Sequence, residues 1–373
     1  MLNAAIGLLL VTARPAPPGL PAPLVRPAPT AALSETLRSF TLTCLAKARA
    51  GLNAFGGIGG VTYEQGRDRW WMASEGLPLI FPVTFDPRSL DPRPRVGTPL
   101  TLHGDPRGET FKKVEALALC HDRFFIGTEA VMASDLPSGR EQDVRVVIAD
   151  RQARVLGDLP LPDPVHRLRP GIGSAFYRGI QGLSCSPDGH QLLVSLQRPL
   201  QQDGEGPMSR QLLYRWQPSR QTFVLEREFL LPLTHQLGLM DSVLLGNDEG
   251  LMLQNEVKPL QRNTLSRFRL DAGDDIRGCV SVRDCPARPA ATTVVLDHIE
   301  RQAGVDLAAN EVQFDAAALG PTLADGRRVV LLVTDDDHCG TLTSPNATIA
   351  PGFAGTTFTR VLLSPAPPEG GRP

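Results

Sequence analysis

The sequence predicts an all-β fold, a single β-propeller of five to six four-stranded blades whose ring is closed by strands from the N- and C-terminal parts of the chain. Two observations carry this prediction: a strand–turn–strand unit that recurs five times, and short apolar runs, separated by turn residues, between the copies. Each copy opens on Gly, Gln or an acidic residue and ends its second strand on Glu, Gln or Asp. The copies span 59–75, 115–129, 181–197, 241–256 and 315–336. Such a unit, repeated about every 60 residues, indicates blades arranged around a central axis.

The segments between the copies supply the remaining strands. Residues 144–149 and 153–157 complete the second unit, and residues 211–216 and 222–228 complete the third. Several of these runs alternate polar and apolar residues, as half-buried strands do. The turn Pro187-Asp188-Gly189 provides the left-handed position that a hairpin needs.

The last unit has no fourth strand of its own before the tail begins. We expect the segment 39–44, which lies before the first unit, to supply it and so to remove an open sheet edge. A sixth, degenerate blade remains an alternative within 80–110 or 257–297.

The flanking segments differ in composition from the repeats. Residues 1–13 form a short apolar run ending in Val-Thr-Ala, which predicts a signal peptide and a secreted or periplasmic protein; a disordered N-terminus is the alternative. Residues 14–34 form a Pro/Ala-rich linker, and 364–373 form a disordered tail of similar character. The folded domain is therefore expected over 35–363. The apolar run is too short for a stable membrane span.

Charge and cysteine usage narrow the function classes. The formal net charge of −2 over 373 residues gives no basic surface for nucleic acid. None of the six cysteines forms a CxxC pair, so a zinc ribbon is not expected. Cys279 and Cys285 bracket a short loop and can close a disulfide in an oxidising compartment. Cys120 and Cys185 lie inside apolar strands and are predicted to be separate, buried small hydrophobes.

Several segments resemble the phytase-like domain family, named for the esterase-like activity of phytase. The segment 179–189, GIQGLSCSPDG, is similar to its GFEGLALSPDG segment. The segments 314–321 (FDAAALGP), 325–328 (DGRR) and 331–336 (LLVTDD) resemble its C-terminal end, and 57–63 and 115–118 resemble two further segments. The resemblance spans about 55–340 and implies a β-propeller, often exported, with phosphoester or ester hydrolysis. The sequence departs from the family at Gln181 and Asp315, where the family has glutamate.

The acids that open and end the repeats are the candidate metal ligands. Innermost strands run along the axis, so equivalent residues form a ring, and converging carboxylates repel unless protons or a cation neutralise them. Ca²⁺ prefers several oxygen ligands, and a bound cation can hold a phosphate and polarise it for attack by water. The alternative is that these acids bond backbone N–H groups or arginines at strand ends, without catalysis. The candidates are Glu75, Glu115, Glu129, Asp241, Glu256, Asp315, Asp335 and Asp336.

Three further residues are candidates for substrate binding: Arg178, Gln181 and His338. Arg178 precedes the third unit, and His338 follows the densest polar cluster of the chain, 334–339. The chain has no GxSxG or HExxH motif, so neither a serine-hydrolase elbow nor a zinc-protease helix is expected. The hypothesis is a cation-assisted hydrolase of a small anionic ester or phosphoester, with Ca²⁺ as its candidate cofactor. The alternative is a non-catalytic propeller that binds a ligand or a partner.

Overall fold

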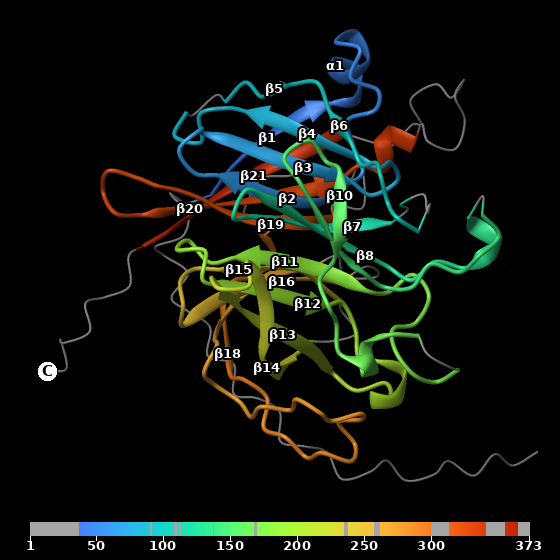
Figure 1. The fold of residues 1–373 in the computed structure, drawn as a ribbon. Helices are drawn as coiled ribbons and strands as arrows, with labels where there is room; N and C mark the ends of the chain where they lie inside the picture. Colours follow the sequence, from blue (N-terminus) through green and yellow to red (C-terminus); the bar gives the residue numbers. More distant parts are fainter. Residues whose placement is uncertain are drawn as a thin grey trace, which may run out of the picture.

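The computed structural model describes residues 37–89, 92–107, 111, 113–136, 138–167, 170–234, 238–256, 262–299, 313–340 and 355–364. It confirms an all-β fold: five antiparallel sheets arranged as the blades of a five-bladed β-propeller (Figure 1). The predicted signal peptide 1–13, the linker 14–34 and the tail beyond residue 364 lie outside the described residues. Within the described ranges, no helix is long and apolar enough to cross a membrane.

Each blade begins with its innermost strand and proceeds outward. The first blade contains β2 (Ile58–Glu64), β3 (Arg69–Ser74), β4 (Leu79–Thr84) and β5 (Arg95–Val96), and β6 (Leu100–Thr101) also pairs with β4. The second contains β7 (Val114–Cys120), β8 (Arg123–Thr128), β9 (Val146–Ala149) and β10 (Val155–Asp158). The third contains β11 (Ile180–Cys185), β12 (Gln191–Leu196), β13 (Met208–Gln217) and β14 (Thr222–Pro232). The fourth contains β15 (Gly238–Leu244), β16 (Glu249–Glu256), β17 (Arg262–Arg269) and β18 (Thr292–Leu296).

The fifth blade joins the two ends of the chain. It contains β19 (Gln313–Thr322), β20 (Arg328–Asp335), β21 (Gly355–Leu363) and, outermost, β1 (Leu37–Thr43). Strand β1 pairs with β21 along its whole length, and the blue and red strands lie side by side in Figure 1. This confirms the prediction that a segment before the first unit completes the last blade. The described parts of 80–110 and 257–297 supply outer strands of the first and fourth blades, so the blade count is five.

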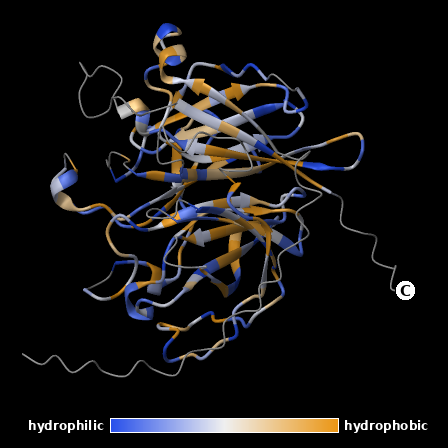
Figure 2. Ribbon diagram, turned by 180° about the vertical axis from the view of Figure 1, so that it is seen from behind, coloured by the Kyte–Doolittle hydropathy of each residue, from blue (hydrophilic) through white to orange (hydrophobic). Residues whose placement is uncertain are grey.

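The hydrophobic core lies between neighbouring blades. Successive strand residues face opposite sides of a sheet, so Trp70 and Trp71 serve two different interfaces. Trp70 packs against Gly320 of β19, where a Cβ atom would lie 2.6 Å from the indole ring. Trp71 contacts Phe124 of β8 in an edge-to-face arrangement with ring centroids 5.2 Å apart. Figure 2 shows hydrophobic stretches running along strands throughout the ring.

All six cysteines are paired in disulfides. Cys279–Cys285 forms as the spacing allowed. The prediction that Cys120 and Cys185 are separate buried hydrophobes is wrong, because they end the adjacent innermost strands β7 and β11 and are bonded to each other. Cys44, which opens helix α1 (Cys44–Arg49), is bonded to Cys339 across 295 residues of sequence. This disulfide covalently reinforces the closure made by β1.

Candidate functional site

Each innermost strand contains one β-bulge at the same level, close to its first residues. In every blade the register of the first two strands skips one residue at this point. A bulge leaves the extra residue out of the ladder and re-aims its side chain. The skipped residues, here called the bulge ring, are Gly59, Glu115, Gln181, Met240 and Asp315.

A second ring lies beside the first, where the second strand of each blade ends. In each blade, the last residue of the innermost strand before the bulge pairs with a residue of the second strand, and the ring member is the next residue of that second strand. The backbone N–H of Glu129 donates to Lys113 O at 3.1 Å, and that of Gln197 donates to Gly179 O at 3.0 Å. The members, here called the end ring, are Glu75, Glu129, Gln197, Asn255 and Asp335. The two rings together surround the entry end of the propeller, the end of its axis at which the innermost strands begin.

The two rings divide the entry end into two sides. The fifth, first and second blades form the acidic side, and the third and fourth blades form the amide side. The acidic side contains Glu75, Glu115, Glu129, Asp315 and Asp335. The amide side contains Gln181, Gln197 and Asn255. The sequence prediction that acids converge at one place thus describes five of the eight candidate ligands.

Three carboxyl groups of the acidic side, Glu115, Glu129 and Asp315, are buried, and all three are close enough to other acids to be repelled by them. Glu115 and Glu129 are 6% and 4% exposed. The Glu115 carboxylate reaches across the first blade's bulge, where a Cβ on Gly59 would lie 3.1 Å from its Oε2 atom. Burial, and then the negative charge of Glu129, raises the pKa of Glu115 well above its usual range. Burial, and then the charge of Asp335, does the same to the pKa of Asp315.

Few positive or donor groups offset this repulsion. The Lys113 ammonium pairs with Glu75 and lies 3.8 Å from Glu115 Oε1. Gln181 Nε2 donates to Glu129 Oε1 at 2.9 Å, and Gln313 Nε2 donates to Asp315 Oδ1 at 2.7 Å. Burial raises the pKa of Glu129 although Lys113 opposes the shift. The five carboxyl groups outnumber the two cations near them, Lys113 and Arg178. The buried members of this set therefore require bound protons or a cation for neutrality.

The remaining candidate ligands lie elsewhere. Asp241 comes one residue after the bulge, and its carboxylate accepts the backbone N–H groups of Ser242 and Ala317, each at 2.7 Å. Asp241 therefore connects β15 to β19 through backbone hydrogen bonds, which is the non-catalytic role given above as the alternative for the repeat acids. Glu256 comes one residue after Asn255, the end-ring member of the fourth blade.

Asp336 belongs to a separate buried cluster at the closure of the ring. Its carboxylate forms an ion pair with Lys47 of α1 and accepts Gly57 N–H at 3.0 Å. The Thr356 hydroxyl of β21 also donates to it, at 3.3 Å. These contacts join the first turn of the first blade to the fifth blade, and they satisfy the charge of Asp336 without an added ion.

The three predicted substrate-binding residues also separate. Gln181 is in the bulge ring, and exposed Arg178 lies near enough to Glu129 for its charge to lower that carboxyl's pKa. His338 is 2% exposed, with Nε2 3.0 Å from the Ser74 hydroxyl, and burial lowers its pKa to about 4. Its ring lies over Gly57, where a Cβ would be 2.5 Å from Nε2. His338 is therefore a neutral packing residue beside Asp336 and not part of the two rings.

Several residues at the entry end escaped the sequence analysis: Lys113, Gln197, Asn255, Gln313 and, next to Gln197, Arg198. The missed signal is the small residue that follows the bulge in four blades: Gly60, Ala116, Gly182 and Ala316. Aligning the units on this residue places Met240, and not Asp241, beside Glu115 and Gln181.

Candidate ligand atoms at the acidic side are spread rather than clustered. Among the described residues, the group of His, Cys, Asp and Glu ligand atoms within 4.8 Å of one another is Cys44, Asp336 and Cys339. Its sulfurs are joined in a disulfide, so that group cannot bind a metal through thiolates. A cation at the acidic side would take one or two carboxylates and complete its shell with water or ligand oxygens, as Mg²⁺ commonly does.

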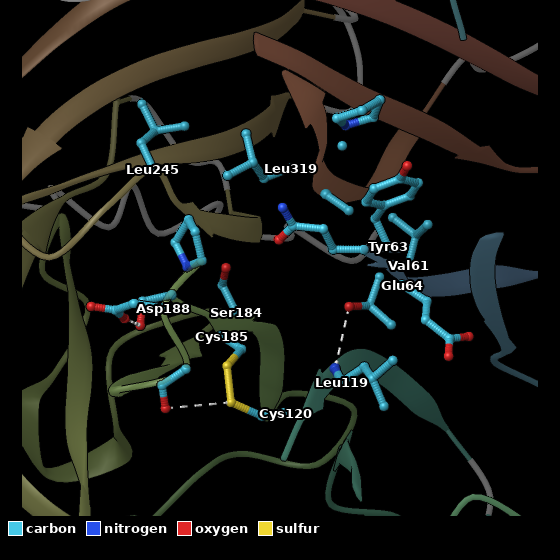
Figure 3. A pocket seen from close by; sticks show the side chains of 18 of the residues that line it. Val61, Tyr63, Glu64, Leu119, Cys120, Ser184, Cys185, Asp188, Leu245 and Leu319 are labelled. Atoms are coloured by element: carbon cyan, nitrogen blue, oxygen red, sulfur yellow. Dashed lines mark hydrogen bonds between the residues drawn. A yellow bond between two sulfur atoms is a disulfide. The ribbon is translucent and has the colours of Figure 1, made fainter. Parts of the chain in front are cut away.

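The opposite end of the axis has a different character. A cavity of about 610 Å³ lies where the innermost strands end, lined by Tyr63, Glu64 and Ser184 among others (Figure 3). The Cys120–Cys185 disulfide forms part of its wall, and Leu119 and Leu319 add apolar surface. This end also has a buried carboxyl group, Glu64, whose Oε2 atom accepts the Trp71 indole N–H at 2.8 Å.

Comparisons with known proteins identify one family. The family model described as "Phytase-like: Esterase-like activity of phytase" matches residues 53–338. No curated protein matches the chain significantly.

Several solved structures are similar to the chain at low identity. A thermostable family-43 glycoside hydrolase is 9% identical with a TM-score of 0.42, over 86% of this chain and 97% of that one. The periplasmic gluconolactonase of Pseudomonas aeruginosa is 11% identical with a TM-score of 0.33, over 82% and 85%. Hydrazine synthase of Kuenenia stuttgartiensis is 11% identical with a TM-score of 0.33, over 75% of this chain and only 56% of that one.

Proposed function

The chain belongs to the phytase-like family, and from this premise and the geometry of its entry end we propose that it hydrolyses a small anionic ester, with phosphoesters as the first candidates. In this proposal a divalent cation, Ca²⁺ or Mg²⁺, binds at the acidic side. The single observation that carries the proposal is that four carboxyl groups, Glu75, Glu115, Glu129 and Asp315, lie within the influence of the Lys113 ammonium, with Asp335 acting on two of them.

The proposal follows from what such a set can do chemically. A divalent cation bound there would polarise a phosphoryl or carbonyl oxygen and help to form a water nucleophile. Two pairs of carboxylates are the candidate ligands for this cation: Asp315 with Asp335, and Glu115 with Glu129. A raised pKa favours the protonated form of a carboxyl group, so whichever of Glu115 and Asp315 does not bind the cation could donate a proton to a leaving group.

The remaining polar residues position these groups. Lys113 holds Glu75 and neutralises part of the charge near Glu115. Gln181 fixes one oxygen of Glu129, and Gln313 fixes one oxygen of Asp315. Each amide leaves the other oxygen of its carboxylate for a ligand.

A non-catalytic binding propeller is the second candidate. The observation that favours it is the replacement of two family glutamates by Gln181 and Asp315, both of which lie in the bulge ring. Losing one carboxylate and shortening another can leave a site that binds a cation or an anionic ligand without turning it over.

The experiment measures turnover and cation binding on one sample. Hydrolysis of p-nitrophenyl phosphate and p-nitrophenyl acetate is followed with Ca²⁺, with Mg²⁺ and with EDTA, and the thermal midpoint is recorded in each condition. We expect turnover with a cation, its loss in EDTA, and a fall of at least about 100-fold in Glu115→Gln. Glu226→Gln on outer strand β14 is the matched control. Cation stabilisation without turnover would favour the binding propeller, and turnover that survives EDTA would overturn the cation mechanism.

We also propose that the protein is exported. Three disulfides use all six cysteines, and such bonds form and persist in oxidising compartments. Cell fractionation of a tagged full-length chain tests this, and retention in the cytoplasm would contradict it.

A further inference from the structure

Arg198 stands out at the amide side because its charge has no counter-ion among the described residues. It follows directly after Gln197 of the end ring and is half-buried. Its Nε atom is buried and has no hydrogen-bond partner within the described part of the chain. Burial, and then the positive charge of Arg178, lowers the pKa of Arg198. The guanidinium group has therefore lost part of its hydration, at Nε, without gaining an anion among the described residues.

Two of the most deeply buried arginines are bound by carboxylates. Arg145 binds Asp105 and Asp158, with contacts of 2.7 Å and 2.9 Å. Arg210, fully buried, binds Asp203 and Glu228, each at 2.7 Å. Arg198 differs from these two arginines because no carboxylate among the described residues pairs with it.

Arg198 lies at the start of the fourth innermost strand and close to the two rings. A Cβ on Gly238 would lie 3.0 Å from Gln197 Cγ and 3.6 Å from Arg198 Nε. Gly238 pairs with Asn255 of the end ring. The absence of a side chain at Gly238 thus keeps the space beside Arg198 open toward the amide side.

The neighbouring groups add donors and a second positive charge. Arg178 precedes Gly179, whose carbonyl accepts Gln197 N–H at 3.0 Å, so the two arginines flank one strand pair. Asn255 Nδ2 is buried with no partner among the described residues. Glu256 is the acid at the position equivalent to Arg198 in the fourth blade, and it forms no ion pair with either arginine within the described contacts.

We propose that Arg198, together with Arg178 and the Asn255 amide, forms a subsite for an oxyanion: the phosphate, sulfate or carboxylate group of a ligand. Guanidinium groups match the geometry of such anions and bind them through two parallel hydrogen bonds. Anion binding at this subsite does not depend on the proposed hydrolysis, whereas the identification of the anion as part of the substrate rests on it. In that case the anionic group sits on the amide side and the scissile bond faces the acidic side.

Calorimetric titration with inorganic phosphate in EDTA tests the subsite without any metal or turnover. We expect binding to the wild-type protein that weakens about 10- to 100-fold in Arg198→Gln, the range for loss of a charge-assisted hydrogen bond. Arg198→Lys should retain part of the affinity because the charge remains. Arg220→Gln, at the exposed turn between β13 and β14 of the same blade, is the control and should bind like the wild type.

The outcomes separate this inference from the proposed function. Phosphate binding that needs Arg198, in a protein without turnover, supports the subsite and counts against hydrolysis. Turnover in a protein that does not bind phosphate, or that binds it equally in Arg198→Gln, overturns the subsite. Arg178→Gln changes an exposed residue, so it provides the same test should Arg198→Gln fold poorly; unchanged affinity in that variant would also count against the inference.

Discussion

Asp335 and Asp336 are neighbours in sequence, yet their surroundings are opposite in kind. Asp336 is 4% exposed and bound by the Lys47 ammonium, the Gly57 N–H and the Thr356 hydroxyl. Asp335 belongs to the end ring, where its charge raises the pKa of Asp315 and adds to the repulsion on Glu115. The first carboxylate has partners supplied by the fold, whereas the second lies among other carboxyl groups.

The difference separates a carboxylate that the fold itself neutralises from one that adds to a group of like charges. A buried ion pair with fixed partners stabilises one arrangement and leaves nothing for a ligand to do. Buried acids that face one another must recruit protons or a cation, and perturbed groups of this kind are typical of functional sites. Each prediction below changes a group on one side of this comparison.

The largest effect is expected at Asp336. In Asp336→Asn the Lys47 ammonium, at 2% exposure, loses its ion-pair partner and keeps only the weaker influence of Asp335, which costs about 3–5 kcal/mol of unfolding free energy. Urea denaturation of the oxidised protein measures this loss. The double variant Lys47→Gln/Asp336→Asn removes both charges and should recover part of it. A single variant within about 1 kcal/mol of the wild type would show that the pair does not hold the ring closed.

A pH-dependent effect is expected at His338. Its pKa is about 4 in the folded protein and 6.5 ordinarily, so only the unfolded chain takes up a proton as the pH falls from 6.5 to 4. Stability is therefore lost across this window, by about 3 kcal/mol from this residue. His338→Asn removes the titration, and asparagine tolerates the residue's φ of +51°.

The control for this prediction is the slope of stability against pH and not its value at one pH. Other titrating groups contribute equally to both proteins, so the difference between the two slopes isolates His338. We expect the variant's unfolding free energy to fall less between pH 6.5 and 4. Equal slopes would mean that the folded protein admits the proton.

The propeller could be predicted from the sequence because its signals are periodic. Five strand–turn–strand units and a missing last strand indicate the blades and the closure, and both depend on patterns that survive small shifts in alignment. Whether a sixth blade lies within 80–110, lies within 257–297 or does not exist could not be decided from the sequence. That decision requires knowing which strands pair, and short apolar runs do not identify pairing partners.

The site was only partly predictable because a bulge shifts the strand alternation by one residue. In the fourth unit the bulge residue is Met240, which is not acidic, so the sequence pattern assigns the ring position to the next residue, Asp241. The Asp241 carboxylate instead accepts a backbone N–H group, that of Ala317. The same offset separates Glu256 from Asn255. The pairing of Cys120 with Cys185 depends on two innermost strands being neighbours in space, which no local pattern in the sequence encodes.

The smallest effect, and the one with an unusual sign, is expected at Glu115. The raised pKa means that the folded protein holds more protons than the unfolded chain above the ordinary carboxyl range, so stability falls as the pH rises through the folded pKa. In EDTA, at the highest pH of the series, Glu115→Gln should have an unfolding free energy about 1 kcal/mol above that of the wild type. This sign is unusual, because most substitutions destabilise a protein by about that amount. Adding Ca²⁺ or Mg²⁺ should make the wild type the more stable of the two proteins. The cation would neutralise the carboxylates of the wild type, whereas the variant lacks one of the ligands that bind it. Thermal midpoints of both proteins from pH 5 to 9, with and without the cation, measure this. A variant that is less stable than the wild type at every pH in EDTA would place Glu115 with Asp336, among the charges that the fold itself satisfies.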